Sequence, residues 1–434
     1  MSDLSLTLPS SAEVVIIGGG VIGVCTAYYL AERGRQVTLV EQGDIASGCS
    51  YGNAGLIVPS HCIPLPAPGV MASGLKWLLD AESPFYIKPR FDLNLFTWLF
   101  QFAAAATEQR VRQAIPVLRD LAYDSRTLWD ELAGQVDCAY EQRGLLVLYL
   151  TGSGLKRGIR EAQIVERNGV PAQVLDAAAV RDMEACVRPE VVGGVYYPDD
   201  AHVTPDRFVR GLAQLAERKG ADIRATTEVL QLETSGRKVV KVKTTRGDFQ
   251  PKQVILAAGS WSPCLVRDLH IHLPSQPAKG YSVTVRRPAA APTIPLDLGE
   301  AWVIATPMIS SAGLVLRLAG TLELAGFDQT INQRRVNAIR RAAHRYLVGT
   351  DGLETLEIWR GLRPCTPDGL PIIGRVQSFD NVIIATGHGM LGMSLGPVTG
   401  RLVSQLVCGE RPDIDLTPLR VGRFYRCSDN VFDS

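Results

Sequence analysis

The sequence lacks several patterns that would assign it to well-known classes of protein. Its nine cysteines form no CxxC pair and no cluster with histidine at the spacing of metal ligands, so we expect no metal site and no iron–sulfur cluster. Lys plus Arg (45) nearly balance Asp plus Glu (44), which gives no reason to expect nucleic acid as a partner. Scattered cysteines are typical of reduced thiols, so we expect a cytoplasmic protein.

The sequence also has no hydrophobic run that reaches the length of a membrane span. Residues 1–13 lack a basic stretch followed by an apolar core, so no secretory signal is expected. The stretch 91–106 comes nearest to a span, but polar residues interrupt it, and we interpret it as a buried helix. The alternative is that its apolar side chains rest on the inner face of the plasma membrane as a peripheral contact. These side chains are Leu95, Phe96, Trp98, Leu99, Phe100 and Phe102.

Three short apolar segments, at residues 14–17, 254–258 and 382–385, each run directly into glycine. Continuous apolar runs of this length are typical of strands buried on both faces of a parallel sheet. We therefore expect the three segments to lie side by side in one sheet of a Rossmann-type domain, within an α/β (α+β) fold. A chain of 434 residues is long enough for a second large domain.

The predicted domains are discontinuous because the three segments are far apart in the sequence. The predicted cofactor-binding domain comprises residues 12–65, 190–265 and 355–425. The predicted substrate-binding domain comprises residues 66–189 and 266–354.

The clearest motif is GxGxxG, with Gly18, Gly20 and Gly23 at the three fixed positions. It follows a predicted strand, opens a predicted helix over residues 21–33, and is followed by Glu41 at the end of the next predicted strand. The glycines would allow the tight turn, the approach of a pyrophosphate and close helix packing, and the helix N-terminus would face the phosphates. Glu41 suits ribose hydroxyls and would repel a 2′-phosphate. The unit therefore predicts a bound FAD or NAD and disfavours NADP.

Longer stretches carry a more specific likeness. They are residues 14–23, Glu41, and residues 47–55, 359–374 and 385–392, with shorter matches at residues 67–70, 279–282 and 326–328. Together they resemble the D-amino acid oxidase/dehydrogenase family of FAD enzymes, and within it the bacterial D-amino acid dehydrogenases most. The resemblance covers nearly the whole chain. It implies FAD as the cofactor and a substrate domain of antiparallel sheet plus helices, with the flavin ring at the domain junction.

The resemblance also implies which residues contact FAD. By this resemblance, Val229 presents its backbone to the adenine, and residues 387–392 begin a helix whose N-terminal N–H groups can stabilise negative charge on the flavin. The implied cofactor-binding residues are Gly18, Gly20, Val21, Ile22, Gly23, Glu41, Gln42, Ser47, Gly48, Ser50, Asn53, Ala54, Gly55, Leu56, Val229, Ala258, Gly259, Trp261, Gly361, Arg363, Gly387, His388, Gly389, Met390, Leu391 and Gly392.

Arg363 matches the family's carboxylate-binding arginine. A guanidinium suits this task because its planar fork bonds both carboxylate oxygens and stays charged when water is removed. Tyr281 resembles the active-site tyrosine or its neighbour, and the alternative is a tyrosine packed in a strand. His61 and His388 are further catalytic candidates. For each of them an ordinary loop histidine is the alternative.

The expected reaction is oxidative deamination of a D-amino acid. Hydride would pass from the α-carbon to flavin N5, and the imine would hydrolyse to a 2-oxo acid. The alternatives are a D-proline, hydroxy-D-proline, sarcosine or glycine dehydrogenase or oxidase, and a flavin-bearing electron-transfer subunit of a larger complex. A quinone or the respiratory chain is the expected electron acceptor, with O2 as the alternative, and the sequence does not fix the oligomeric state.

Overall fold

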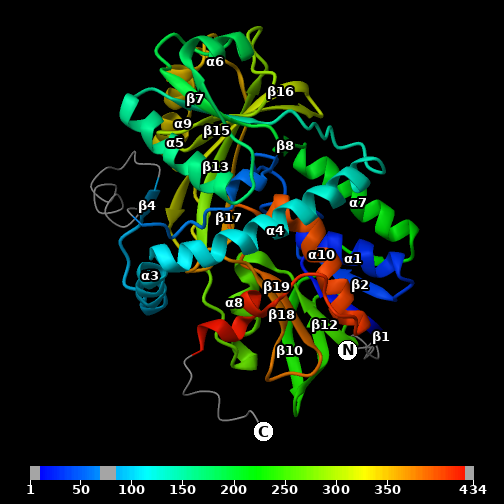
Figure 1. The fold of residues 1–434 in the computed structure, drawn as a ribbon. Coiled ribbons are helices and arrows are strands. Elements are labelled where there is room, and N and C mark those ends of the chain that lie inside the picture. The colour runs from blue at the N-terminus through cyan, green and yellow to red at the C-terminus, as the bar shows by residue number, and fades with distance from the viewer. Residues whose placement is uncertain (1–9, 69–84, 426–434) are drawn as a thin grey trace.

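The computed structural model of the protein describes residues 10–68 and 85–425, so Gly69 and Val70 of the match at residues 67–70, and Cys427, lie outside the described residues. Two large sheets dominate the described chain. In Figure 1 the first sheet lies in the lower half and the second in the upper half, and helix α4 (Glu108–Ala133) crosses between them.

The first sheet has the strand order β10-β11-β12-β1-β2-β9, and β19 joins it beside β12 and pairs with β18. Strands β2 and β12 flank β1 in parallel, and β19 is parallel to β12, so the three predicted apolar strands do lie side by side. The strands are β1 (Ser10–Ile17), β2 (Val37–Val40), β9 (Asp222–Arg224), β10 (Val229–Ser235), β11 (Lys238–Thr244), β12 (Phe249–Leu256), β18 (Ile372–Arg375) and β19 (Val382–Thr386).

Helices α1 (Val21–Glu32), α7 (Pro205–Arg218) and α10 (Gly392–Cys408) pack together beside this sheet. Every residue of α1 from Val21 to Ala31 is buried, because α7 and α10 cover the sides of α1 that the sheet leaves open. A helix enclosed in this way holds its N-terminus in a fixed place at the carboxyl end of β1, where an anion can bind.

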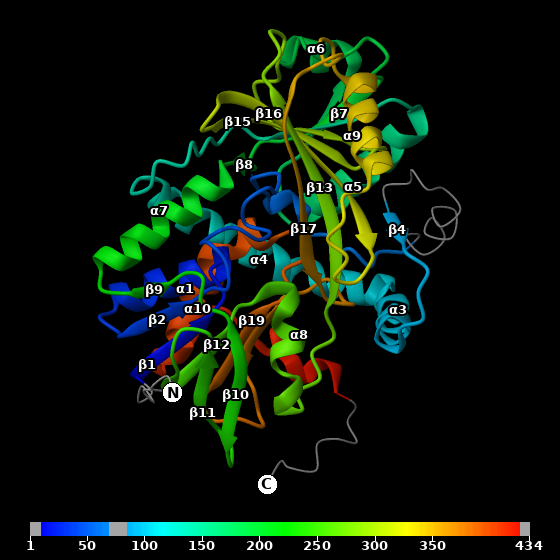
Figure 2. The ribbon, with the colours of Figure 1, turned by 180° about the vertical axis from the view of Figure 1, so that it is seen from behind.

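The second sheet has the strand order β17-β13-β16-β15-β14-β5-β7-β6, with β4 beside β16. Most neighbours are antiparallel, and helix α9 (Gln333–Tyr346) packs against the long strands β13 and β16 (Figure 2). The strands are β4 (Phe85–Ile87), β5 (Leu145–Tyr149), β6 (Gln173–Asp176), β7 (Gly193–Tyr197), β13 (Gln276–Arg286), β14 (Leu296–Leu298), β15 (Val303–Ser310), β16 (Gly313–Leu324) and β17 (Thr355–Cys365).

Sheet membership differs from the predicted domain boundaries in two places. β7 pairs with β5 and β6, and β17 pairs with β13 along nearly its whole length, so both strands belong to the second sheet. The predicted boundaries at residues 190 and 355 assign both strands to the cofactor-binding domain instead. The sheet to which a strand belongs depends on the strands that it pairs with, and the local sequence does not predict those partners. The division into domains itself stays a prediction.

Helix α3 (Leu93–Ala105) covers most of the stretch 91–106, and it is buried on one face only. Trp98 and Phe102 pack against strand residues of the second sheet, whereas Phe91 is 92% exposed and Phe100 is 74% exposed. The interpretation as a buried helix therefore holds for one face and is wrong for the other. None of the described helices is both long enough and apolar enough to cross a bilayer.

The remaining elements complete the described chain. They are β3 (Leu56–Ile57), η1 (Pro59–His61), α5 (Gly152–Arg167), α6 (Ala177–Met183), β8 (Ala201–His202), η2 (Gly259–Trp261), α8 (Ser262–Leu265), η3 (Arg267–Leu269), η4 (Thr417–Leu419) and η5 (Val421–Phe424).

Candidate active site

A cavity of about 640 Å³ lies between the glycine-rich ends of the first sheet's strands and β17, the edge strand of the second sheet. Most of the predicted cofactor residues line it: Gly18, Gly20, Val21, Ile22, Glu41, Gln42, Ser47, Gly48, Ser50, Asn53, Val229, Ala258, Gly259, Trp261, Gly361, Arg363, His388, Gly389, Met390 and Gly392. The structure thus gathers residues that are spread over more than 370 positions of the sequence into one site.

The GxGxxG turn has no room for larger side chains. A Cβ on Gly18, which has φ of 116°, would lie 2.5 Å from the carbonyl oxygen of Ala257. A Cβ on Gly23 would lie 1.9 Å from the carbonyl oxygen of Gly18, so helix α1 can approach the turn this closely only because residue 23 is glycine. Gly23 itself does not line the cavity, and its role is to set the position of the helix that does.

Glu41 stabilises the glycine turn through a hydrogen bond and also lines the cavity. Its Oε2 accepts a hydrogen bond from the Gly19 amide at 2.7 Å, and its Oε1 accepts one from the Gly43 amide at 2.9 Å. A carboxylate oxygen can accept more than one hydrogen bond, so these contacts leave acceptor capacity for ribose hydroxyls. The geometry is compatible with the predicted ribose contact.

The loop of residues 47–55 closes over the same turn. Ser50 Oγ accepts a hydrogen bond from the Val21 amide at 2.9 Å, so one N–H group at the N-terminus of α1 is already occupied. Asn53 Nδ2 donates to the Cys49 carbonyl and Asn53 Oδ1 accepts from the Gly55 amide, which locks the shape of the loop. The remaining first-turn amides of α1 have no partner within the helix and suit a pyrophosphate.

His388 stands where α10 begins, and it is 4% exposed. Its Nε2 lies 2.9 Å from Thr399 Oγ1, while its buried Nδ1 has no hydrogen-bond partner among the described residues. Burial lowers the pKa of His388 to about 3, so the ring is neutral at physiological pH. A buried nitrogen without a partner is expensive unless a ligand supplies one, and a polar flavin ring placed in this cavity fits that need.

Arg363 brings a positive charge to the cavity, and its side chain is only partly exposed there. Its Nη1 donates to the Thr321 carbonyl at 2.9 Å, and burial lowers its pKa. Within the described ranges no carboxylate lies within 4.0 Å of its guanidinium. Arg317 is buried, and it donates to the Tyr51 and Asn53 carbonyls, so it holds the loop of residues 47–55 in place. Arg360 lies at the rim, where its Nε donates to the Gln329 carbonyl.

Two predicted catalytic side chains are not brought to the cavity. Tyr281 is 1% exposed, packs in the core under α9, and donates its hydroxyl to Glu323 Oε2 at 2.9 Å. Successive strand residues point to opposite faces, so Tyr281 faces away from the side that Gly280 presents to Arg363. His61 lies in η1, where burial lowers its pKa to about 4, and it does not line the cavity. Direct catalytic roles for these two residues are not retained.

The other predicted residues outside the lining shape the backbone behind it. Gly55 has φ of 67°, and a Cβ there would lie 2.1 Å from the Val203 carbonyl oxygen. The Ala54 carbonyl accepts from Thr306 Oγ1 at 2.9 Å, which ties the loop to the second sheet. Leu56 pairs with His202 between β3 and β8. Gly387 and Leu391 flank His388 in the turn before α10.

Several lining residues were not predicted. They are Ile17, Gly19, Val40, Gly43, Cys49, Thr227, Glu228, Ala257, Ser260, Cys264, Leu265, Gln329, Arg360, Leu362, Pro364, Ala385, Thr386 and Met393. Cys49 and Leu362 sit inside the recognised stretches and could have been found by including every residue of each stretch. Gln329 carried no such signal, because only the folding of the loop after β16 brings it to the rim. The described residues include no group of three His, Cys, Asp or Glu placed to hold a metal ion.

Comparison with known proteins gives a consistent result. A profile of the family described as FAD dependent oxidoreductase matches residues 13–406. The chain is 35% identical over 420 residues to a protein of Methylobacterium radiotolerans named D-amino acid dehydrogenase, which covers 95% of this chain and 99% of the relative. A protein of the same name from Paramagnetospirillum magneticum is 35% identical over 421 residues, again covering 95% and 99%.

Solved structures show the same fold. Glycine oxidase from Geobacillus kaustophilus superimposes with a TM-score of 0.78 at 25% identity, covering 96% of this chain and 100% of that one. L-proline dehydrogenase from P. horikoshii has a TM-score of 0.73 at 21% identity, covering 96% and 98%.

Proposed function

This chain belongs to the FAD dependent oxidoreductase family, and we propose that it oxidises D-amino acids whose carboxylate is held by Arg363. The enzyme is FAD-dependent and acts on amino acids by oxidative deamination. When bound, FAD supplies the acceptor for the hydride that leaves the α-carbon of the substrate. The roles of the individual residues follow from the cavity.

The residues present fit FAD along the whole cavity. Gly20 and the first-turn amides of α1 would hold the pyrophosphate, and Glu41 would hold the ribose of the adenosine half. At the other end the neutral ring of His388 and the N-terminus of α10 would meet the polar edge of the flavin. A helix N-terminus carries partial positive charge, so it would favour negative charge at that edge.

The single observation that carries the proposal is the charge on Arg363. A guanidinium largely shielded from water, with no carboxylate partner among the described residues, is unfavourable, and an amino acid supplies a carboxylate in the shape that a guanidinium binds best. With the carboxylate fixed, the α-carbon is held at one distance and one orientation. The enantiomer whose α-hydrogen faces the flavin then reacts, and we propose that this is the D form.

Among the described residues that line the cavity, the carboxylates Glu41 and Glu228 lie at the end proposed for adenosine, which leaves His388 as the candidate base. Burial lowers the pKa of His388, and its Nε2 is already hydrogen-bonded to Thr399 Oγ1. We therefore propose that the substrate amine reacts in its neutral form, and that Arg363 and the enclosed cavity contribute by orienting it and excluding water. The imine product would then hydrolyse to a 2-oxo acid and ammonia.

Anaerobic mixing of the FAD-bound protein with a panel of amino acids tests the proposal. The panel contains D-alanine, D-proline, hydroxy-D-proline, sarcosine, glycine and the L-enantiomers, and the measurement is bleaching of the flavin absorbance. Bleaching by D-amino acids and not by their L-enantiomers supports the proposal. Bleaching by L-amino acids alone contradicts it, and bleaching by no member would favour an electron-transfer subunit that depends on a partner.

A second candidate is oxidation of glycine or a secondary amine, and the structural match to glycine oxidase at 25% identity favours it. Faster bleaching by glycine or sarcosine than by any D-amino acid with a side chain would establish this alternative. The same panel therefore ranks both candidates in one experiment.

We also propose that the protein makes peripheral contact with a membrane through α3 and reduces a quinone there. Three apolar side chains of this helix, Leu93, Phe96 and Phe100, are more than half exposed, as is Phe91 just before it. On the opposite face, the indole N–H of Trp98 donates to the Cys365 carbonyl at 2.9 Å, two residues beyond Arg363. The exposed face is thus linked by one packed helix to the wall of the cavity.

Flotation with vesicles of phosphatidylcholine and phosphatidylglycerol tests this contact. We expect the protein to float with the vesicles and the double variant Phe96→Ser, Phe100→Ser to stay behind, with flavin reduction by substrate unchanged. Equal flotation of both proteins contradicts the role of α3. Formation of hydrogen peroxide under air, at a rate that matches substrate loss, would identify O2 and not a quinone as the acceptor.

A further inference from the structure

The guanidinium of Arg363 does not stay above its own strand but reaches over the neighbouring strand β13. There it lies against Gly280, whose backbone pairs with Gly361. A Cβ on Gly280 would lie 2.1 Å from Nη1 and 2.3 Å from Nη2 of Arg363. The absence of a side chain at this position therefore creates the seat of the guanidinium.

On the other side of Gly280, strand β16 contains a bulge. Lys279 pairs with Glu323 and Tyr281 pairs with Gly320, so Thr321 and the residue after it stand opposite the single residue Gly280. Thr321 has φ of 62°, the left-handed region that β-branched residues rarely adopt. Its carbonyl accepts the hydrogen bond from Arg363 Nη1, so the bulge points this carbonyl at the guanidinium.

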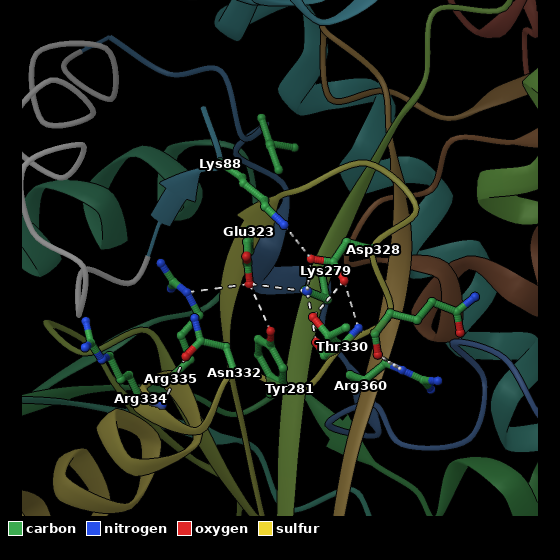
Figure 3. A network of polar contacts seen from close by, with 12 residues as sticks. Lys88, Lys279, Tyr281, Glu323, Asp328, Thr330, Asn332, Arg334, Arg335 and Arg360 are labelled. Carbon is green, nitrogen blue, oxygen red and sulfur yellow. Dashed lines mark hydrogen bonds and ion pairs between the residues drawn. The ribbon is translucent and has the colours of Figure 1, made fainter. Parts of the chain in front are cut away.

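A buried polar network holds the end of the bulge, and Figure 3 shows it at close range. Glu323 Oε2 accepts from the Tyr281 hydroxyl at 2.9 Å and lies 3.7 Å from Lys279 Nζ and 3.6 Å from Arg335 Nε. All four side chains are at most 4% exposed. The residues on either side of Gly280 thus both contact the acidic residue that ends the bulge.

The network also extends to the rim of the cavity. Lys279 Nζ donates to the Thr330 carbonyl at 3.1 Å and lies 3.6 Å from Asp328, in the loop that brings Gln329 to the rim. Unpaired buried charges are costly, so this arrangement fixes the strands and the loop in one register. These contacts join the side of the sheet that α9 covers to the two strands, β13 and β16, that hold Arg363 on the opposite side.

We propose that Tyr281, Lys279 and Glu323 are positioning residues that act through the Thr321 carbonyl and Gly280 to set the Arg363 guanidinium for the substrate carboxylate. This inference rests on the proposed function of Arg363. A guanidinium has five N–H groups, and the bond to Thr321 fixes its plane while leaving other N–H groups for the carboxylate. The network thereby governs substrate binding without touching substrate.

The test is the dependence of anaerobic flavin reduction on the concentration of the best substrate in the panel above, measured on FAD-bound variants. Tyr281→Phe removes one hydroxyl and should raise the half-saturating concentration about ten-fold, with a limiting rate within about two-fold of the original. Gly280→Ala should raise the half-saturating concentration about a hundred-fold, because the guanidinium must leave its seat.

Tyr346→Phe is the matched control. Tyr346 is also 1% exposed and donates its hydroxyl to a glutamate, Glu300, but it lies at the end of α9 and does not line the cavity. A loss of buried hydroxyl bonding alone would lower stability in both tyrosine variants. A change in half-saturation confined to Tyr281→Phe separates positioning from stability.

Glu323→Gln keeps the shape of the side chain and provides a second test if Gly280→Ala fails to fold. Its half-saturating substrate concentration should rise about five-fold or more, because the ion pairs of Glu323 are lost. Original half-saturation in both Tyr281→Phe and Glu323→Gln, or an equal rise in Tyr346→Phe, would overturn the inference. Arg363→Leu, measured alongside, keeps the two proposals apart. If Arg363→Leu shows the original half-saturating concentration, the proposed function itself fails. If only Arg363→Leu loses substrate binding while the network variants keep it, the proposed function stands and only the inference about positioning fails.

Discussion

The two ends of the cavity are built on different principles. The end proposed to receive the adenosine and pyrophosphate consists of glycine turns and backbone amides, mostly within residues 18–55. The end proposed to receive the carboxylate depends on one side chain, Arg363, whose supports come from β13, β16 and β17. A backbone cradle is specified by a local motif, whereas an aimed side chain is specified by the register of strands far apart in the sequence.

The two ends also treat charge differently. The carboxylate of Glu41 is compensated by two backbone amides of its own neighbourhood before any ligand arrives. The cation of Arg363 has a carbonyl partner and, within the described chain, no carboxylate nearby. We therefore propose that the substrate supplies the missing partner of Arg363, whereas Glu41 already has its partners within the protein. Changes at the two ends should separate cofactor binding from turnover.

Replacing Arg363 with Leu should have the largest effect on turnover. We expect kcat/KM to fall by about three powers of ten or more, because the carboxylate would lose its charged partner in a buried site. FAD content should stay near that of the original protein, since Arg363 is one of many lining residues. Steady-state kinetics with the best substrate and the flavin-to-protein absorbance ratio check both statements. Near-normal turnover would contradict the assignment.

Gly23→Ala should damage the cofactor end instead. A Cβ there would lie 1.9 Å from the Gly18 carbonyl oxygen, so helix α1 must move away from the turn. The Kd for FAD should rise about a hundred-fold. Titration of the apoprotein with FAD measures this. Gly152→Ala, at the start of α5 where a Cβ meets no atom within 4 Å, should leave the Kd unchanged.

Glu41→Gln should have a smaller effect on the same end. The amide group cannot accept at both of its ends, so one of the bonds from Gly19 and Gly43 is lost. The Kd for FAD should rise about ten-fold, while substrate half-saturation at saturating FAD stays the same. Glu13→Gln is the control, since Glu13 also accepts from a backbone amide, that of Gln36, but lies outside the cavity. An equal rise in Kd for both variants would show that the loss is structural.

The smallest effect concerns pH and His388. Burial lowers the pKa of His388 from 6.5 to about 3, so folding keeps the ring neutral. The resulting stability is fully present above pH 6.5 and is lost as the pH falls below it. Between pH 8 and 5.5 this group should lower the free energy of unfolding by about 1 kcal/mol.

Urea unfolding at a series of pH values, with FAD in fixed excess, measures this slope. His388→Gln should flatten the slope, and His272→Gln, at an exposed position, should not. An unchanged slope in His388→Gln would show that the ring has the same pKa in the folded and unfolded protein, so that it is not shielded from water.

Local patterns predicted the central strands of the first sheet and the glycine turn beside them. The apolar strands at residues 14–17, 254–258 and 382–385 pair as expected. The reason is that buried parallel strands and glycine turns leave strong signals within a few residues. The resemblance added the loops at 47–55 and 387–392, most of which line the cavity.

Tyr281 shows where that reasoning stops. A strand residue one position from Gly280 looks equivalent to it in the sequence, yet the pleat places the two on opposite faces. The bulge in β16 that aims the Thr321 carbonyl depends on pairing between residues about 40 positions apart. The exposed face of α3 is a similar case, because large apolar residues occur on more than one side of the helix and only the packing decides which side is covered.

The sequence by itself determined the family and its FAD cofactor, and it predicted the FAD-contacting residues and the carboxylate-binding arginine, because each depends on residue types at short, fixed spacing. The tertiary structure decided which side chains reach the cavity and how Arg363 is held. Those outcomes depend on strand register, on the glycine that leaves room for the guanidinium, and on a buried network between distant strands. No short-range pattern encodes such long-range pairing, because a shift of one residue in register moves every side chain to the other face.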